Sequence, residues 1–280
     1  MNKKTGYLRL SEYHLKKLQK EMLLLLLEVD RICRKHNIQY FLAYGTLIGA
    51  VRHGSFIPWD DDVDIEMLRE DYEKFCELCK TELDHTKFSL QNQQTDQHYN
   101  WVFGKLKLKN TSYVRSGQEH LKQQDGIFID IFPLDHITDN RFKQRLTLLI
   151  CKVCRKILWA QVGKKNASQP LLRGIYKLLS YIPRSLIVSI FNFMAKCDNR
   201  KNTSFLVSHN YLSGYIFKRE WYDSVITLEF EGHLFYAPKG YDKTLSMIYG
   251  EYMKLPPVEK RQGNSHASFI KFLDGTELKF

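Results

Sequence analysis

A short acidic run in the first quarter of the chain contains residue types that could do chemistry. The segment 44–67, YGTLIGAVRHGSFIPWDDDVDIEM, holds Asp60, Asp61, Asp62 and Asp64 among apolar residues that are typical of a protein core. Carboxylates crowded into an apolar setting repel one another and lose hydration. Oxygen-rich clusters select Mg²⁺ or Mn²⁺, and such ions offset charge during displacement at phosphorus. The run therefore predicts a divalent-metal site for phosphate chemistry.

The spacing of the acidic residues predicts that they share one face of a strand. Pro58 cannot donate to a sheet ladder, so we expect the strand to begin near Trp59. Side chains alternate along a strand, which would place Asp60, Asp62 and Asp64 on the same side. A solvated acidic turn is the plainer interpretation, but the flanking apolar residues disfavour it.

A pair of small residues precedes this run. Gly45 and Thr46 follow a predicted short strand at 38–43 and open a predicted helix. Gly45 lets backbone approach a phosphate, and the N–H groups after Thr46 can donate to it. A D-x-D motif alone also occurs in sugar-nucleotide glycosyltransferases. Gly45-Thr46 with Asp62-Val63-Asp64 sixteen residues later is more specific and predicts a two-part phosphate site.

The order of helix, strand, Gly-Thr turn, helix and D-V-D strand resembles the nucleotidyltransferase fold, in which a third carboxylate comes from a later strand. Asp130, within GIFIDIFPLD, is the candidate, and Asp135 is the second choice. The motifs YGTLIGAVRHGSFIPWDDDVDI, EDYEKF, GIFIDIFPLD and YGEYMKLPP resemble the LicD family of phosphorylcholine transferases, distant relatives of fukutin, from about residue 38 to 266.

This resemblance implies transfer of phosphocholine, or a similar phospho-alcohol, from CDP-choline or a related donor to a hydroxyl group. The acceptor would be a cell-surface polysaccharide, lipopolysaccharide or teichoic acid precursor, free or lipid-linked. The resemblance assigns Asp62 and Asp64 as Mg²⁺ or Mn²⁺ ligands and places Gly45 and Thr46 at the donor phosphates. Position and chemistry add Asp130 as third ligand or general base. A glycosyltransferase using D-V-D and a non-enzymatic membrane scaffold are the alternatives.

Other residues are candidates for substrate binding, and each has a plainer structural interpretation. Arg52 and His53 could contact donor phosphate, or form a salt bridge and a turn. Lys105 could neutralise a phosphate, or be a solvated strand lysine. Four aromatic residues could cage a quaternary ammonium or simply pack in the core, and one loop histidine is a weak candidate. These five are Trp59, Trp101, Tyr249, Tyr252 and His266.

Length and composition predict how these residues are positioned. A chain of 280 residues with 44% apolar content can bury a large core. We expect an α+β fold in which a nucleotidyltransferase-like mixed sheet is flanked by helices. Residues 1–280 would form one catalytic domain, and 136–205 a basic, mainly helical insertion.

The net charge of +11 is concentrated in one stretch. Residues 141–201 contain fourteen Lys or Arg and a single acidic residue, Asp198, interleaved with apolar residues. This pattern suits helices lying on an anionic membrane surface, or an ordinary solvated basic face. Nucleic acid is not an expected partner, because the stretch has few aromatic residues and matches no nucleic-acid-binding module.

The N-terminal sequence, the apolar runs and the cysteines indicate in which cellular compartment the protein is expected. The polar N-terminal sequence does not resemble a signal peptide, and no apolar run reaches the roughly 18 residues that span a bilayer. We expect a cytoplasmic protein, peripheral at the inner face of the plasma membrane if the basic helices bind lipid. The six cysteines are expected as reduced thiols, and no structural zinc is expected because the two C-x-x-C pairs lie far apart in helix-like sequence.

Overall fold

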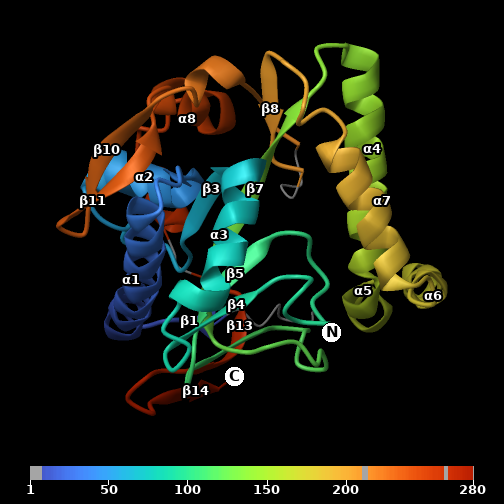
Figure 1. The fold of residues 1–280 in the computed structure, drawn as a ribbon. Coiled ribbons are helices and arrows are strands. Elements are labelled where there is room, and N and C mark those ends of the chain that lie inside the picture. The colour runs from blue at the N-terminus through green and yellow to red at the C-terminus, as the bar shows by residue number, and fades with distance from the viewer. Residues whose placement is uncertain (1–7, 210–213, 262–263, 280) are drawn as a thin grey trace.

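A mixed β-sheet forms the centre of the computed structural model, which describes residues 8–209, 214–261 and 264–279 (Figure 1). Five strands pair in the order β2–β3–β7–β5–β4, and β8 and β9 continue the pairing from the far end of β7. Strands β3 and β7 are parallel, whereas the other pairs are antiparallel. The predicted α+β fold with a mixed sheet is therefore confirmed. The strands are β2 (Phe41–Leu42), β3 (Asp64–Leu68), β4 (Phe88–Gln91), β5 (Gly104–Leu108), β7 (Ile127–Ile137), β8 (Phe205–Val207) and β9 (Ile216–Lys218).

Two helices cover one face of this sheet (Figure 1). Helix α1 (Glu12–Lys35) begins after Ser11, whose hydroxyl accepts the His14 backbone N–H, as the N-cap pattern predicts. Helix α3 (Arg69–Glu82) follows β3 directly. Both helices contact β7, whose isoleucines Ile127, Ile129 and Ile131 are fully buried in the same core. Because strand side chains alternate, Asp130 points to the opposite face.

The acidic run differs from the sequence-based expectation. Strand β3 begins at Asp64 and not near Trp59, because the Asp60 N–H donates to the Ile57 carbonyl at 2.9 Å and closes a turn after Pro58. Asp60 and Asp62 therefore precede the strand, and the expected alternation of three aspartates along it is wrong. Pairing with β7 still reaches back to residue 63, through the Asp130 N–H and the Val63 carbonyl at 2.9 Å.

The Gly-Thr pair also lies differently from the prediction. Helix α2 (Tyr44–His53) begins at Tyr44, so Gly45 and Thr46 are in its first turn and not in a turn before it. Tyr44 has a φ of 47°, a left-handed conformation that costs roughly 1–2 kcal/mol for a non-glycine residue. The chain thus leaves β2 and enters α2 through one strained residue.

The C-terminal third adds smaller units around the sheet. The hairpin of β10 (Val225–Phe230) and β11 (His233–Pro238) packs on α2 and β2, and α8 (Tyr241–Tyr249) lies beside α2. Residues 100–114 do not form one continuous hairpin arm. Strand β5 belongs to the central sheet, whereas β6 (Ser112–Arg115) pairs with the C-terminal strand β13 (Ala267–Lys271). Their three-stranded sheet has the order β14 (Glu277–Lys279), β13, β6. Short elements elsewhere are β1 (Leu8–Arg9), β12 (Asn264–Ser265), η1 (Arg219–Trp221) and η2 (Val258–Lys260).

The basic stretch is helical, as predicted, and forms a unit beside the sheet that we call the helical layer (Figure 1). Helices α4 and α7 pack on each other through Cys151, Cys154, Leu158, Ile187 and Phe191, and α7 contacts β7. The two cysteines are buried thiols in this interface. The layer consists of α4 (Arg141–Leu158), α5 (Ala160–Asn166), α6 (Pro170–Leu179) and α7 (Arg184–Lys196).

A buried ion pair joins the start of α3 to the end of β7. Arg69 Nε and Nη2 donate to the two carboxylate oxygens of Asp135 at 2.8 and 2.7 Å, and Asn199 Nδ2 donates to Asp135 at 2.7 Å. Asp135 is fully buried. This second-choice carboxylate is therefore held by a structural contact five residues beyond Asp130.

Removing the charge of Asp135 should destabilise the fold, because Arg69 would remain buried without its counter-ion. We expect Asp135→Asn to lower the free energy of unfolding by about 3 kcal/mol in urea titrations. The Glu229→Gln change, at an exposed carboxylate of β10, is the control and should have little effect. Equal stability of the two variants would contradict a structural role for this ion pair.

Candidate functional site

Three charged side chains form a row across three neighbouring strands. Asp64 on β3 is the Cα partner of Asp130 on β7 in the parallel pair. Asp130 is in turn the partner of Lys105 on β5 in the antiparallel pair. Directly paired residues in a sheet point to the same face with Cβ atoms about 5 Å apart. The structure thus brings together the predicted residues Asp64, Asp130 and Lys105.

Lys105 is buried and forms an ion pair with Asp130. Its ammonium group lies 3.5 Å from the centre of the Phe128 ring, a cation–π contact. Burial lowers the pKa of Lys105 to about 7, although the neighbouring Asp130 charge opposes the shift. The solvated-lysine interpretation is therefore wrong for Lys105, which supplies positive charge at the row.

The other aspartates of the run adjoin this row. Burial raises the pKa of Asp62 to about 6, and the negative charges of Asp61 and Asp130 add to the shift. Burial and the charges of Asp62 and Asp130 likewise raise the pKa of Asp64 well above its usual range. For Asp60, burial and the neighbouring Asp62 and Asp61 raise the pKa in the same direction. Negative charge is concentrated here beyond what the local cations offset.

Sequence reasoning missed two further side chains that contact the acidic cluster. The Tyr113 hydroxyl donates to Asp61 Oδ2 at 3.0 Å, and Arg115 Nη2 lies 3.9 Å from Asp130 Oδ2. Burial raises the pKa of Asp61, while the Tyr113 hydrogen bond and the charge of His266 oppose the shift. Both missed residues come from β6. Only the pairing of β6 with the C-terminal strand β13 brings them here, and the sequence carries no local signal for that pairing.

The donor set fits a hard divalent ion in its chemistry. The aspartates of the cluster offer carboxylate oxygens, and burial, together with the repulsion among these carboxylates, raises the pKa values of Asp62 and Asp64. Among the described residues, no group of three or more His, Cys, Asp or Glu side chains is already arranged to hold a metal ion. Asp130 is engaged by Lys105, so its carboxylate would have to turn to join Asp62 and Asp64 on one ion.

Gly45 and Thr46 position the acidic cluster directly. The Thr46 hydroxyl accepts the Asp64 backbone N–H at 2.9 Å, which ties the first turn of α2 to the start of β3. A Cβ atom at residue 45 would lie 2.5 Å from Asp60 Oδ2, so any other residue there would displace the Asp60 carboxylate from its present position. Thr46 is therefore next to the predicted metal ligand Asp64, and Gly45 is next to Asp60 of the same acidic run.

Glu66 continues the face that carries Asp64. It is buried and accepts hydrogen bonds from the hydroxyls of Tyr44, at 2.6 Å, and Tyr222, at 3.2 Å. Burial raises the pKa of Glu66 to about 7, and the two tyrosine hydrogen bonds oppose the shift. The alternation from Asp64 to Glu66 was a signal in the sequence for this buried carboxylate. The hydrogen bond from the Tyr44 hydroxyl to Glu66 also holds the strained Tyr44 in place.

Arg52 and His53 lie at the other end of α2. Six residues of helix separate Thr46 from Arg52, a rise of about 9 Å. Arg52 Nη1 donates to the Tyr252 carbonyl at 2.7 Å, and Arg52 Nε donates to His53 Nε2 at 3.0 Å. These contacts join α2 to the segment after α8. The structure does not bring either residue to the row of Asp64 and Asp130.

The four aromatic candidates also lie in different parts of the structure and not around one site. Trp59 is half-buried against the core with Arg261 6.0 Å from its ring, Tyr249 is exposed near the end of α8, and the Tyr252 hydroxyl donates to Asp242. Trp101 instead lines a cavity of about 680 Å³ whose wall includes Asp130. This cavity, which we call the Asp130 cavity, lies between the sheet and the helical layer. Phe103, Arg115, Phe132, Arg155, Trp159 and Tyr176 also line it.

A mixed sheet with paired carboxylates on neighbouring strands defines a nucleotidyltransferase-like protein. A family model described as "LicD/FKTN/FKRP, nucleotidyltransferase domain" matches residues 37–148, and the chain carries a domain of this LicD family. Over 251 residues the chain is 29% identical to the lipopolysaccharide cholinephosphotransferase LicD of Haemophilus influenzae, covering 82% of this chain and 88% of that protein. A 35-residue stretch is 53% identical to the human ribitol 5-phosphate transferase FKRP, covering 12% of this chain and 7% of that protein.

Crowding in the acidic cluster should have a measurable cost in stability. The folded state binds a proton at Asp62 more tightly than the unfolded state, so the charged carboxylate destabilises the fold above about pH 6. In EDTA we expect Asp62→Asn to raise the free energy of unfolding by on the order of 2 kcal/mol at pH 8. The gain should shrink towards zero near pH 4.

Urea titrations at the two pH values measure this effect. The matched change is Asp84→Asn, at a carboxylate whose pKa a Thr86 hydrogen bond lowers to about 2, and it should not stabilise the protein. A pH-independent effect of Asp62→Asn would show that Asp62 is not under electrostatic strain.

Proposed function

We propose that this protein transfers phosphocholine, or a similar phospho-alcohol, from a CDP-activated donor to a hydroxyl of a cell-surface glycan precursor. The observation that carries the proposal is the pairing of Asp64 with Asp130 inside the segment that matches the family model. The relatives named for cholinephosphate and ribitol 5-phosphate transfer support the class of group transferred. Lipopolysaccharide, capsular polysaccharide and teichoic acid precursors are the acceptors that fit this chemistry.

Asp62 and Asp64 would hold Mg²⁺ or Mn²⁺. When bound, the ion would offset charge on the donor phosphate oxygens during displacement. The Thr46 hydroxyl holds the backbone of Asp64, and Gly45 leaves room for the Asp60 carboxylate, so the first turn of α2 lies beside the acidic run. Lys105 and Arg115 supply further positive charge beside Asp130.

Asp130 is suited to receive the acceptor proton. Its side chain lines the Asp130 cavity, whose lining includes neither Asp62 nor Asp64. In the reaction the acceptor oxygen forms a bond to the donor phosphorus, and the bond from that phosphorus to CMP breaks. The hydroxyl proton passes to the Asp130 carboxylate, which Lys105 holds in place.

Charge-neutral substitutions of the proposed ligands should abolish turnover without unfolding the protein. We expect Asp62→Asn and Asp64→Asn each to lower CMP release from CDP-choline with Mg²⁺ by at least about 100-fold, because an electrostatic contact to the transition state is lost. The exposed Asp84→Asn variant should retain full activity, and circular dichroism checks folding. Nucleotide release from a sugar nucleotide alone would indicate the glycosyltransferase alternative, and retained activity would remove that residue from the mechanism.

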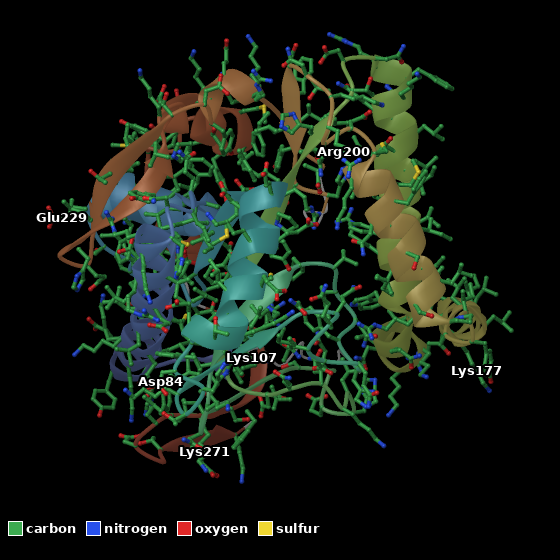
Figure 2. The ribbon with its side chains drawn as sticks, viewed as in Figure 1. Asp84, Lys107, Lys177, Arg200, Glu229 and Lys271 are labelled. Carbon is green, nitrogen blue, oxygen red and sulfur yellow. The ribbon has the colours of Figure 1, made fainter. Side chains whose placement is uncertain are left out.

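The helical layer supports a second part of the proposal, peripheral binding to an anionic membrane. Phe142, Leu146, Leu149 and Val153 are exposed at helical spacing along α4, and the Phe142 side chain is 76% exposed. Helix α7 exposes a further stripe, and no residue of α6 is buried. Lysines and arginines flank these stripes; Lys177 lies at the outer edge of the layer, away from the sheet (Figure 2). The stripe on α7 consists of Leu186, Ile190 and Phe193.

An anionic bilayer fits this surface better than a second copy of the chain. Fourteen basic residues and one acidic residue lie between residues 141 and 201, so two copies of this face would repel. Apolar side chains among cations are typical of helices that lie in the membrane interface. Within the residues described, no individual helix combines the length and apolarity of a membrane span; α6 and α7 do so only together, across an 87° bend.

Vesicle co-sedimentation measures this binding. We expect the protein to sediment with vesicles containing phosphatidylglycerol, to be released by high salt, and not to sediment with neutral vesicles. The double change Phe142→Ser and Leu149→Ser should weaken binding at least tenfold. Val258→Ser, at a 72%-exposed side chain outside the layer, is the matched control. Equal binding to neutral vesicles, or dimerisation in solution through these stripes, would contradict the proposal.

A further inference from the structure

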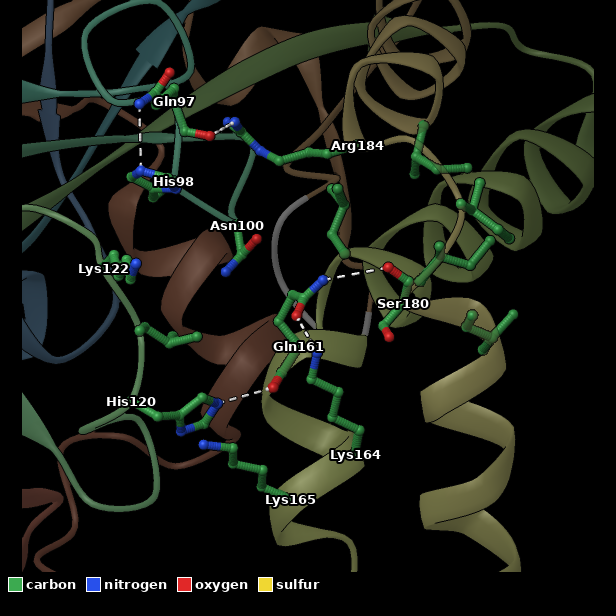
Figure 3. Close-up of a pocket in the computed structure, with 16 residues that line it drawn as sticks. Gln97, His98, Asn100, His120, Lys122, Gln161, Lys164, Lys165, Ser180 and Arg184 are labelled. Atoms are coloured by element: carbon green, nitrogen blue, oxygen red, sulfur yellow. Dashed lines mark hydrogen bonds between the residues drawn. The ribbon is translucent and has the colours of Figure 1, made fainter.

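A second cavity, of about 510 Å³, lies between the loops around residues 97–122 and the helical layer (Figure 3). Loop side chains line one wall, and side chains from α5 and the start of α7 line the other. We call it the basic cavity, because its lining is rich in histidine, lysine and arginine side chains. These are His98, His120, Lys122, Lys164, Lys165 and Arg184.

The basic cavity lacks compensating negative charge. Among the described residues that line it, none is Asp or Glu. Asp96 is near enough for its charge to act on Arg184, yet burial still lowers the pKa of that guanidinium. The Asp96 carboxylate is already occupied, because it accepts the backbone N–H groups of His98 and Gln124 at 2.8 Å and the Gln91 side chain at 2.7 Å.

Several donors in the cavity are available to a ligand. Arg184 Nη1 donates to the Gln97 carbonyl, whereas Arg184 Nε is buried with no hydrogen-bond partner among the described residues. A buried unpaired donor costs free energy, and an oxyanion would satisfy it. Lys164 donates to the Gln161 side chain at 2.6 Å, which holds its ammonium group at the cavity wall (Figure 3).

The basic cavity adjoins the Asp130 cavity. Asn100 and Leu158 line both spaces, so a ligand long enough to pass these two side chains would contact both cavities. The apolar side chains of Ile157 and Ile187 complete the wall of the basic cavity. A group bound by Arg184 and Lys164 would therefore belong to a molecule whose other end reaches Asp130.

We propose that the basic cavity binds a phosphate group of the acceptor, so that the acceptor is a phosphorylated sugar and not a neutral glycan. Phosphate is favoured over a carboxylate because the cavity offers two lysines, an arginine and two histidines beyond Lys164, more charge than one carboxylate would offset. The link to the acceptor rests on the proposed transferase function. The phosphate binding itself does not, and it can be measured separately.

Calorimetric titration of the full chain with glucose 6-phosphate in EDTA tests the site. We expect the sugar phosphate to bind, with salt-sensitive affinity, and glucose not to bind. The double change Arg184→Gln and Lys164→Gln should weaken binding at least tenfold. Lys177→Gln, which removes a cation from α6 outside the cavity, is the matched control and should leave binding unchanged. Circular dichroism checks folding, and Lys164→Gln alone replaces the double variant if that variant unfolds.

Three results would overturn the proposal. One is equal binding of glucose 6-phosphate by the cavity variant and the wild-type protein, and another is equal binding of glucose. The third is a protein that does not bind glucose 6-phosphate but does bind phosphatidylglycerol vesicles, with the vesicle binding abolished in the cavity variant. That result would assign the cavity to a lipid headgroup. Asp64→Asn should bind glucose 6-phosphate normally, so loss of transferase activity and loss of this site are distinguishable.

Discussion

The register between β3 and β7 is the constraint on which the candidate site depends. It pairs Asp64 with Asp130, and it is fixed by apolar packing on the other face of the sheet, where Ile129 and Ile131 are buried under α1 and α3. A slip by one residue would turn Asp130 into that core and an isoleucine towards the site. Burial of the isoleucines thus holds two carboxylates together against their repulsion.

The charge balance at this point explains why the site suits phosphate chemistry. Lys105 and Arg115 form ion pairs with Asp130, while Asp62 and Asp64 lie close enough for its charge to act on them. Burial raises the pKa values of Asp62 and Asp64, and the repulsion among the carboxylates adds to the shift, so both side chains favour protons. A divalent cation would relieve the same repulsion, and it would leave positive charge for a bound pyrophosphate.

Local patterns predicted the parts of this site that depend on nearest neighbours in the sequence. The apolar residues around Asp130 predicted a buried strand, which β7 confirms, whereas the D-V-D spacing predicted a shared strand face that does not form, because Asp62 precedes β3. The start of β3 was misplaced because a turn at Ile57–Asp60 replaces the strand there, although Pro58 at the second position of that turn is a signal for it. Arg115 could not be found, since its approach to Asp130 depends on long-range pairing of β6 with β13.

The helical layer combines two surfaces that sequence periodicity alone does not separate. Its side towards the sheet lines the Asp130 cavity and the basic cavity with Arg155, Lys164 and Arg184, while Phe142 and Leu149 are exposed on its outside. Composition over this stretch indicates only that basic and apolar residues alternate. The packing of Cys151, Cys154 and Phe191 decides which cations turn inwards. A membrane-bound layer of this kind would bring an acceptor carried on lipid to Asp130 without its leaving the bilayer surface.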